Sequence, residues 1–226
     1  MNILNSNQPT FRYHWKWGPN PSPYLAASRV IVLDLLDPEF VERCAVSFAK
    51  MSAPAKPGAL TAQEMGWRWQ NDANELLRNA IVNAGVGPFE MMSDLEPLLV
   101  RLHDQVRYHH DMPVWSTVLG AWMLSGPERI LRFPQMGLEV PFKPGTLVLF
   151  DSAQPHGLLR PGETEYVTQA DMDEHPISMV SFSCFKKDVI NKLLDVQTYD
   201  SAVHADVRHT VDQYKVCDRT GSIEFR

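Results

Sequence analysis

The residues best suited to bind a metal in this sequence are His109, Asp111 and His156. Residues two apart in an extended strand point to the same face, so His109 and Asp111 would lie together while His110 points away. An imidazole and a carboxylate on one face offer two adjacent ligands to one cation. His156 lies in a later short segment, residues 155–158, and is the candidate third ligand.

Short apolar segments must position these side chains. Residues 144–152, Pro-Gly-Thr-Leu-Val-Leu-Phe-Asp-Ser, have the pattern of a turn, a buried strand and a second turn, and His156 follows them. Similar segments separated by Gly and Pro recur through the second half of the chain, which indicates a sandwich or barrel. We expect strands near residues 107–111, 116–124, 128–133, 138–142, 146–151, 156–159 and 176–185.

The first half of the chain has the patterns of supporting strands and helices. Asp37-Pro38-Glu39 combines a capping residue, a first-turn proline and an acid, which is typical of a helix start. Capping boxes begin at Thr61 and Ser93. Helices followed by many short strands predict an α+β fold. We expect strands over residues 12–17 and 29–36, and helices over residues 37–51, 61–85, 93–106 and 189–196.

Length, charge and cysteine content bound the remaining possibilities. A chain of 226 residues suits a single domain, 1–226, and its net charge of -6 disfavours nucleic acid as a partner. Three cysteines without a CxxC pair disfavour a disulfide framework and favour a reducing, cytoplasmic location. No segment has the pattern of a signal peptide or of a membrane span.

Residues 107–185 resemble the double-stranded β-helix of the Fe(II)/2-oxoglutarate-dependent oxygenases. The resemblance rests on the order of four features: the His109-His110-Asp111 motif, the segment 130–134, the Pro-Gly turn and apolar strand of 144–152, and the distal His156. It implies an α+β fold with a jelly-roll core over 107–185. Residues 1–106 would then form an N-terminal strand and helical support, and 186–226 a C-terminal helix and a polar tail.

The resemblance also implies chemistry. His109, Asp111 and His156 would form the facial triad of a non-haem iron site, which leaves open positions for a chelating co-substrate and dioxygen. 2-Oxoglutarate would be that co-substrate, and the reaction would hydroxylate a C–H bond of a small-molecule or peptide substrate. The expected cofactors are therefore Fe(II) and 2-oxoglutarate.

The sequence departs from the family pattern where the far carboxylate of 2-oxoglutarate is usually held. Family members place an Arg or Lys on the last core strand, but residues 176–181 carry no such cation, although Ser178 could supply the hydroxyl that often follows it. Arg129 and Arg132 lie three positions apart, so they point to opposite faces of a strand. The candidate substitutes for the missing cation are Arg129, Arg132, Arg160 and a protonated His175.

Three other functions remain open from the sequence. The chain could be an iron enzyme on the same scaffold that does not use 2-oxoglutarate, which the missing strand cation favours. It could also be a non-catalytic β-helix binding module, or a zinc or cupin-like protein with the same ligands. Tyr108 and Trp122 could line a pocket or belong to the core. Residues 66–70 could cover the core or form a substrate lid.

Overall fold

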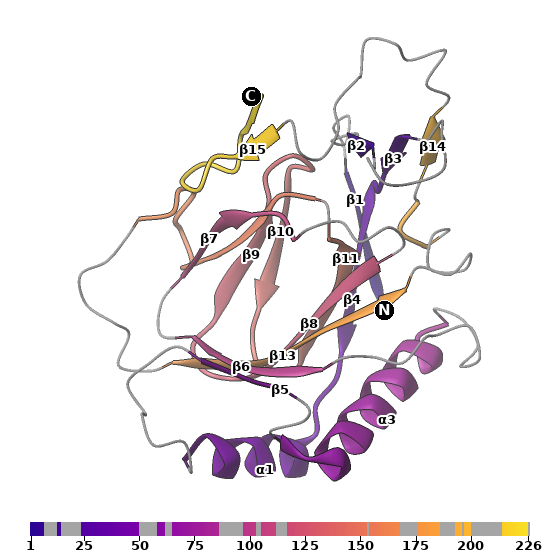
Figure 1. The fold of residues 1–226 in the computed structure, drawn as a ribbon, viewed down its shortest axis with the longest axis vertical. Coiled ribbons are helices and arrows are strands. Elements are labelled where there is room, and N and C mark those ends of the chain that lie inside the picture. Colours follow the sequence, from indigo (N-terminus) through magenta and orange to yellow (C-terminus); the bar gives the residue numbers. More distant parts are fainter. Residues whose placement is uncertain are drawn as a thin grey trace.

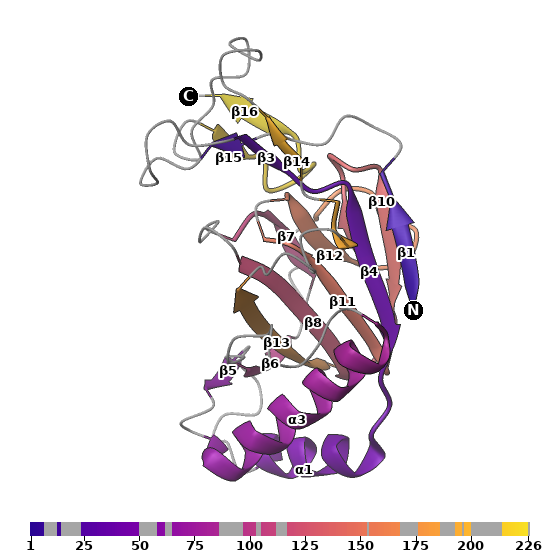
Figure 2. The ribbon, with the colours of Figure 1, turned by 90° about the vertical axis from the view of Figure 1, so that its right-hand side faces the viewer.

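Two antiparallel β-sheets pack face to face and form the centre of the fold (Figures 1 and 2). The structure is a computed structural model. It describes residues 1–6, 13–14, 24–49, 58–61, 65–85, 97–102, 105–111, 117–152, 154–167, 176–185, 193–195, 197–199 and 214–225.

The strands of the two sheets follow one another along the chain in a jelly-roll order. The major sheet has seven strands, in spatial order β1 (Asn2–Asn5), β4 (Arg29–Asp34), β11 (Thr146–Asp151), β8 (Thr117–Ser125), β13 (Ile177–Phe185), β6 (Leu98–Leu102) and β5 (Gly58–Thr61). The minor sheet has four, in spatial order β10 (Leu138–Phe142), β9 (Arg129–Phe133), β12 (His156–Leu159) and β7 (Val106–His109).

From β6 to β13 the chain passes from one sheet to the other at every step except the β9–β10 hairpin. This alternation between two antiparallel sheets is the double-stranded β-helix, or jelly roll. The predicted fold class, α+β with a jelly-roll core, is therefore confirmed. The seven predicted strands between residues 107 and 185 all form, within two residues of their expected ends.

Apolar side chains fill the space between the two sheets. Leu131 and Phe133 of β9 point into it, as do Val148 and Phe150 of β11. Period-two alternation in each strand sends these residues inward and their neighbours outward. Burial of this surface on both sheets supplies the hydrophobic stabilisation that holds them face to face. The same alternation determines which residues of each strand point into the space between the two sheets.

Two helices, α1 (Pro38–Ala49) and α3 (Trp67–Asn83), cover the other face of the major sheet (Figures 1 and 2). Phe40 of α1 is fully buried and stacks on Trp122 of β8, with ring centroids 5.2 Å apart. The Trp122 indole N–H donates a hydrogen bond of 2.8 Å to the carbonyl of Leu35. Trp122 is thus part of the core on the helix side of the sheet and does not face the minor sheet.

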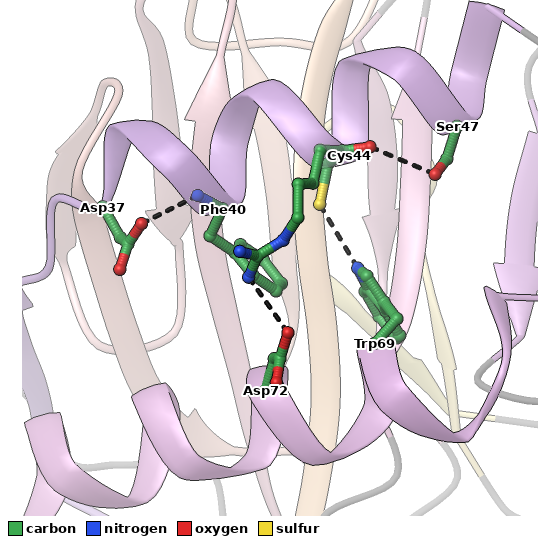
Figure 3. Close-up of polar contacts among 7 residues, drawn as sticks. Asp37, Phe40, Cys44, Ser47, Trp69 and Asp72 are labelled. Atoms are coloured by element: carbon green, nitrogen blue, oxygen red, sulfur yellow. Dashed lines mark hydrogen bonds and ion pairs between the residues drawn. The ribbon is translucent and has the colours of Figure 1, made fainter.

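Side-chain contacts fix the start of α1 and its pairing with α3 (Figure 3). The Asp37 carboxylate accepts a hydrogen bond of 2.7 Å from the Phe40 backbone N–H, as the sequence pattern predicts for a helix cap. Trp69 of α3 is buried and donates from its indole N–H to the Cys44 sulfur at 3.3 Å. Trp69 therefore packs in the helix–sheet core, which answers the open question about residues 66–70 for this side chain.

Several sequence predictions are wrong in the first half and the tail. In the segment 93–106, where a helix is predicted, the described residues instead form β6 and the start of β7, because β6 pairs with both β13 and β5. Residues 93–96 and 103–104 lie outside the described residues. Thr61 ends strand β5, and α3 begins after Gly66, which has a φ of 87° that glycine tolerates. The jelly roll thus begins at β6, ahead of residue 107. Most of the helix predicted over 189–196 lies outside the described residues.

The tail, expected to be polar, contributes strands. The described part of the tail adds β14 to a three-stranded sheet and forms the hairpin β15–β16. The C-terminal hairpin, residues 214–225, lies beside the minor sheet, at the end of the molecule away from the helices (Figures 1 and 2). The remaining strands are β2 (Tyr13–His14), β3 (Tyr24–Ala26), β14 (Gln197–Tyr199), β15 (Tyr214–Val216) and β16 (Ile223–Phe225). No described helix is long and apolar enough to span a membrane.

Candidate metal centre

His109, Asp111 and His156 converge at one end of the minor sheet. Their nearest imidazole nitrogen and carboxylate oxygen atoms all lie within 4.8 Å of one another. His109 Nε2 is 3.8 Å from Asp111 Oδ1, and His156 Nε2 is 3.4 Å from Asp111 Oδ2. The two imidazole rings have centroids 4.4 Å apart. Side chains from two neighbouring strands and from the residues just after one of them thus surround one point.

The pairing of β7 with β12 brings the two histidines together. His109 and His156 are direct cross-strand partners in this antiparallel pair. Side chains of such partners share one face of the sheet at close range. His156 is only 6% exposed at its side chain, whereas His109 is 37% exposed. His156 thus forms the buried side of the cluster, and β7 brings the other ligands to it from the edge of the sheet.

A β-bulge in β7 turns His109 towards the cluster. Val106 pairs with Leu158 and His109 pairs with His156, so three steps along β7 match two steps along β12. Val106 packs with the residues between the sheets, and strict alternation would then send His109 to the opposite face. The extra residue restores the inward direction of His109, which is a known use of bulges beside active sites.

Asp111 lies just beyond the strand and not within it. β7 ends at His109, and the Asp111 backbone N–H donates a hydrogen bond of 3.1 Å to the carbonyl of Ser152. Ser152 belongs to the turn between β11 and His156, and it is buried. One short turn therefore helps to position two of the three ligands. The predicted proximity of His109 and Asp111 is correct, but the predicted strand over 107–111 ends two residues earlier.

Backbone carbonyls fix the orientation of both imidazole rings. Nδ1 of His109 lies 2.8 Å from the carbonyl of Arg107, and Nδ1 of His156 lies 2.9 Å from the carbonyl of Gln154. A carbonyl only accepts, so each Nδ1 carries the proton. In a neutral ring Nε2 then keeps its lone pair and points at the cluster. This is the second-shell arrangement that prepares histidine for a metal.

The environment favours the protonation states of His109 and Asp111 that metals require. Burial, and next the charge of His156, lower the pKa of His109, which favours its neutral form. Burial by itself would raise the pKa of Asp111, but the hydrogen bond and charge that His156 supplies when protonated, together with the charge of protonated His109, outweigh it and lower that pKa. At neutral pH the cluster therefore offers a neutral imidazole and an ionised carboxylate.

This donor set fits a divalent iron. Two imidazoles and one carboxylate are the ligands that non-haem Fe(II) sites use, on one face of the ion. Donor atoms about 2.1 Å from an ion and at right angles lie about 3 Å apart. The separations here, 3.4 and 3.8 Å from Asp111 to the two imidazoles and at most 4.8 Å within the set, would have to shorten when an ion binds. A closed tetrahedral thiolate site is not an option, because no cysteine belongs to the described cluster. His110 is not part of the cluster either.

The candidate anchors for 2-oxoglutarate differ from one another in where their side chains lie. Arg129 is 4% exposed and alternates in phase with Leu131 and Phe133, so it faces the space between the sheets. Arg132 points to the outer face, where it pairs with the carboxylate of Glu139 on β10. Arg160 follows β12 and is half-buried. His175 lies outside the described residues.

The hydroxyl groups of β13 divide between its two faces. Ser178 alternates in phase with Val180 and Phe182, which pack under the helices, so Ser178 lies on the face away from the metal cluster. Ser181 pairs with Ala121, which lines the space between the sheets, and Ser181 shares that face. The serines that could reach an inner site are therefore at 181 and 183, which the sequence analysis did not select.

Comparison with solved structures finds chains that match most of this one, at low sequence identity and with TM-scores below 0.5. A Pseudomonas putida prolyl-4-hydroxylase is 14% identical, with a TM-score of 0.48 over 70% of this chain and 92% of that chain. Iron-bound HygX from Streptomyces hygroscopicus is 11% identical, with a TM-score of 0.46 over 80% of this chain and 90% of that chain. SnoN, described as a non-haem α-ketoglutarate-dependent epimerase from nogalamycin biosynthesis, is 11% identical, with a TM-score of 0.42 over 78% of this chain and 82% of that chain.

No protein-family model matches the sequence, and no curated protein matches it significantly. Because each of these TM-scores is below 0.5, the fold assignment rests on the strand order of the two sheets. That order and the His–Asp–His cluster agree with the resemblance seen in the sequence, to the double-stranded β-helix of the Fe(II)/2-oxoglutarate-dependent oxygenases.

Proposed function

We propose that this protein is a non-haem iron oxygenase that uses 2-oxoglutarate as co-substrate and hydroxylates a C–H bond of a small molecule or peptide. The observation that carries the proposal is the convergence of His109, Asp111 and His156 within 4.8 Å on the minor sheet of a jelly roll. Two imidazoles and one carboxylate on one side of an ion leave its other positions for exchangeable ligands.

The protein's own residues would divide the work at this site. His109, Asp111 and His156 would hold Fe(II), with each imidazole kept in place by a carbonyl on its Nδ1 side. When bound, iron and 2-oxoglutarate together supply the oxidation of the substrate by dioxygen. Phe133 and Phe150 pack around His156, with ring centroids 6.2 and 4.7 Å from the imidazole, and would exclude water from that side of a bound ion.

Binding of iron and 2-oxoglutarate to the purified protein tests this proposal directly. Under anaerobic conditions, Fe(II) and 2-oxoglutarate together should produce a weak visible charge-transfer band, which neither should produce alone. Admission of dioxygen should then release succinate, even without the true substrate. Iron binding with no band and no succinate would reject the role of 2-oxoglutarate. Failure to bind iron, with retention of zinc instead, would reject the oxygenase.

Arg129 is the proposed anchor for the far carboxylate of 2-oxoglutarate, because it faces the space between the sheets and Arg132 does not. Charge-assisted hydrogen bonds to a carboxylate are worth about 1.5–3 kcal/mol, so Arg129→Met should weaken 2-oxoglutarate binding by about tenfold or more. Titration of the iron-loaded protein with 2-oxoglutarate measures this. Arg132→Met is the matched control, and an equal effect of both variants would remove Arg129 from the role.

One observation favours a second function, an iron enzyme that does not use 2-oxoglutarate. Phe133 of β9 lies against His156, and Arg129 starts the same strand four residues away, about 13 Å along it. The last core strand, β13, carries no Lys or Arg at all. Because β13 offers no cation to hold the far carboxylate of 2-oxoglutarate, the open positions of iron would take dioxygen and the substrate itself. The charge-transfer measurement above distinguishes the two functions.

A further inference from the structure

β7 forms the edge of the minor sheet, and its free side is held by the C-terminal hairpin. The spatial order of the minor sheet ends at β7, so β12 is the only described strand that pairs with it. The Tyr108 backbone N–H donates a hydrogen bond of 3.0 Å to the carbonyl of Asp218, in the turn of the hairpin. Tyr108 lies inside the β7 bulge, next to His109. The hairpin therefore contacts the backbone at the residue that precedes a proposed metal ligand.

The Tyr108 side chain is enclosed between two glycines on the outer face of the minor sheet. A Cβ atom on Gly157 of β12 would lie 2.7 Å from the ring, and one on Gly221 of the hairpin would lie 2.9 Å from it. The ring is 1% exposed, and its hydroxyl donates a hydrogen bond of 3.1 Å to the carbonyl of Thr164. Only residues without a side chain allow β12 and the hairpin to approach the ring this closely.

Further contacts tie the hairpin to the rest of the minor sheet. The Gln135 side-chain amide donates to the carbonyl of Gly221 at 3.1 Å, and the Tyr166 backbone N–H donates to the carbonyl of Arg219 at 2.8 Å. Arg107 pairs with the Asp218 carboxylate at 3.0 Å, but both side chains are more than half exposed, so this ion pair contributes little by itself. The backbone and ring contacts fix the hairpin against the bulge.

From these contacts we propose that the C-terminal hairpin, residues 214–225, is a positioning element of the metal centre. It holds the β7 bulge through Tyr108 and so keeps His109 directed at Asp111 and His156. The inference rests on the proposed iron site and extends it, because it assigns a metal-site role to a segment that begins 105 residues after His109. Tyr108 and Gly221 are positioning residues: neither donates an atom to the cluster.

Gly221→Ala is the variant that tests this role. The added methyl group would lie 2.9 Å from the Tyr108 ring and 2.3 Å from Pro134, and Gly221 has a φ of 71°, so the hairpin must move away from the bulge. Gly85→Ala is the matched control: Gly85 has a similar φ of 77° at the end of α3, and its added methyl group would meet nothing within 4 Å. Tyr108→Phe, which removes only the hydroxyl bond to Thr164, is a milder second variant.

The measurement uses Co(II) as a spectroscopic probe of the full-length protein, together with the melting temperature of the metal-free form. Loss of second-shell support typically weakens metal binding by about 10- to 100-fold, so Gly221→Ala should weaken Co(II) binding by that factor and change the Co(II) visible spectrum. Gly85→Ala introduces the same kind of backbone strain without the clash, so it should lower the melting temperature less than Gly221→Ala and keep the wild-type affinity and spectrum. Tyr108→Phe should weaken Co(II) binding several-fold.

The outcomes separate this inference from the iron site itself. If the wild type binds Co(II) at His109 and His156, and Gly221→Ala binds it with the same affinity and spectrum, the hairpin has no positioning role. If Gly221→Ala does not fold, Gln135→Leu, which removes the amide hydrogen bond to the carbonyl of Gly221 in the hairpin, decides in the same way. If the wild type does not bind Co(II) or Fe(II), the proposed function fails first and the inference fails with it.

Discussion

His156→Ala should abolish measurable Fe(II) binding, and His109→Ala should do the same. Each variant removes one of the three donors that converge on the site. Second-shell changes alone cost about 10- to 100-fold in metal affinity, so loss of a direct ligand should cost at least about 100-fold. The measurement is the rise in melting temperature on anaerobic addition of Fe(II), which depends on the ratio of free metal to the dissociation constant.

His110→Ala provides the control for both variants. His110 is adjacent to His109 in the chain but does not belong to the ligand cluster. It should therefore keep most of the metal-dependent stabilisation, whereas the two ligand variants lose it. Equal loss in all three variants would show that His110 takes part in binding, and the β7 register would have to be revised.

Trp122→Ala should cause the largest loss of stability of any single substitution considered, about 3–5 kcal/mol. Trp122 is fully buried, stacks on Phe40 and donates its indole N–H to the carbonyl of Leu35. The substitution opens a cavity under α1 and leaves that carbonyl without its donor. Denaturant unfolding of the metal-free protein, read as a change in midpoint at constant slope, gives the free-energy difference.

Trp122→Ala also tests whether the core on the helix side of the sheet affects the metal centre. Because Trp122 lies on the helix side of the major sheet, the folded fraction of Trp122→Ala should bind Fe(II) with nearly wild-type affinity. Leu36→Ala is the stability control, since Leu36 is 71% exposed and its loss should cost little. A large loss of metal affinity in Trp122→Ala would place this residue in the site after all.

Turn chemistry made the second half of the chain predictable. The boundaries of β10, β11 and β12 agree with the predicted ranges, and Gly145, with a φ of 89°, occupies the turn before β11 as the Pro-Gly pattern requires. Buried strands between such turns leave little freedom in register. The positions of the strands could therefore be inferred from the sequence, whereas the proximity of His156 to β7 was implied only by the resemblance to the double-stranded β-helix.

Features set by distant partners could not be predicted. The segment 93–106 has a capping box, but pairing of Leu98–Leu102 with β13 overrides that local preference. The β7 bulge leaves no signature in the local sequence, because the match of three residues to two depends on β12 and on the hairpin. For the same reason the sequence could not show that Ser178 lies on the helix face of β13.

The unequal exposure of the three ligands determines how an ion would enter and leave. The side chains of His109 and Asp111 are 37% and 42% exposed, whereas that of His156 is 6% exposed. Water can thus reach one side of the ion while the jelly roll stays closed behind it. Loading and chelation should then proceed by ligand exchange at the surface, without global unfolding, and the metal-free protein should keep its fold, unlike a zinc finger that unfolds when its metal is removed.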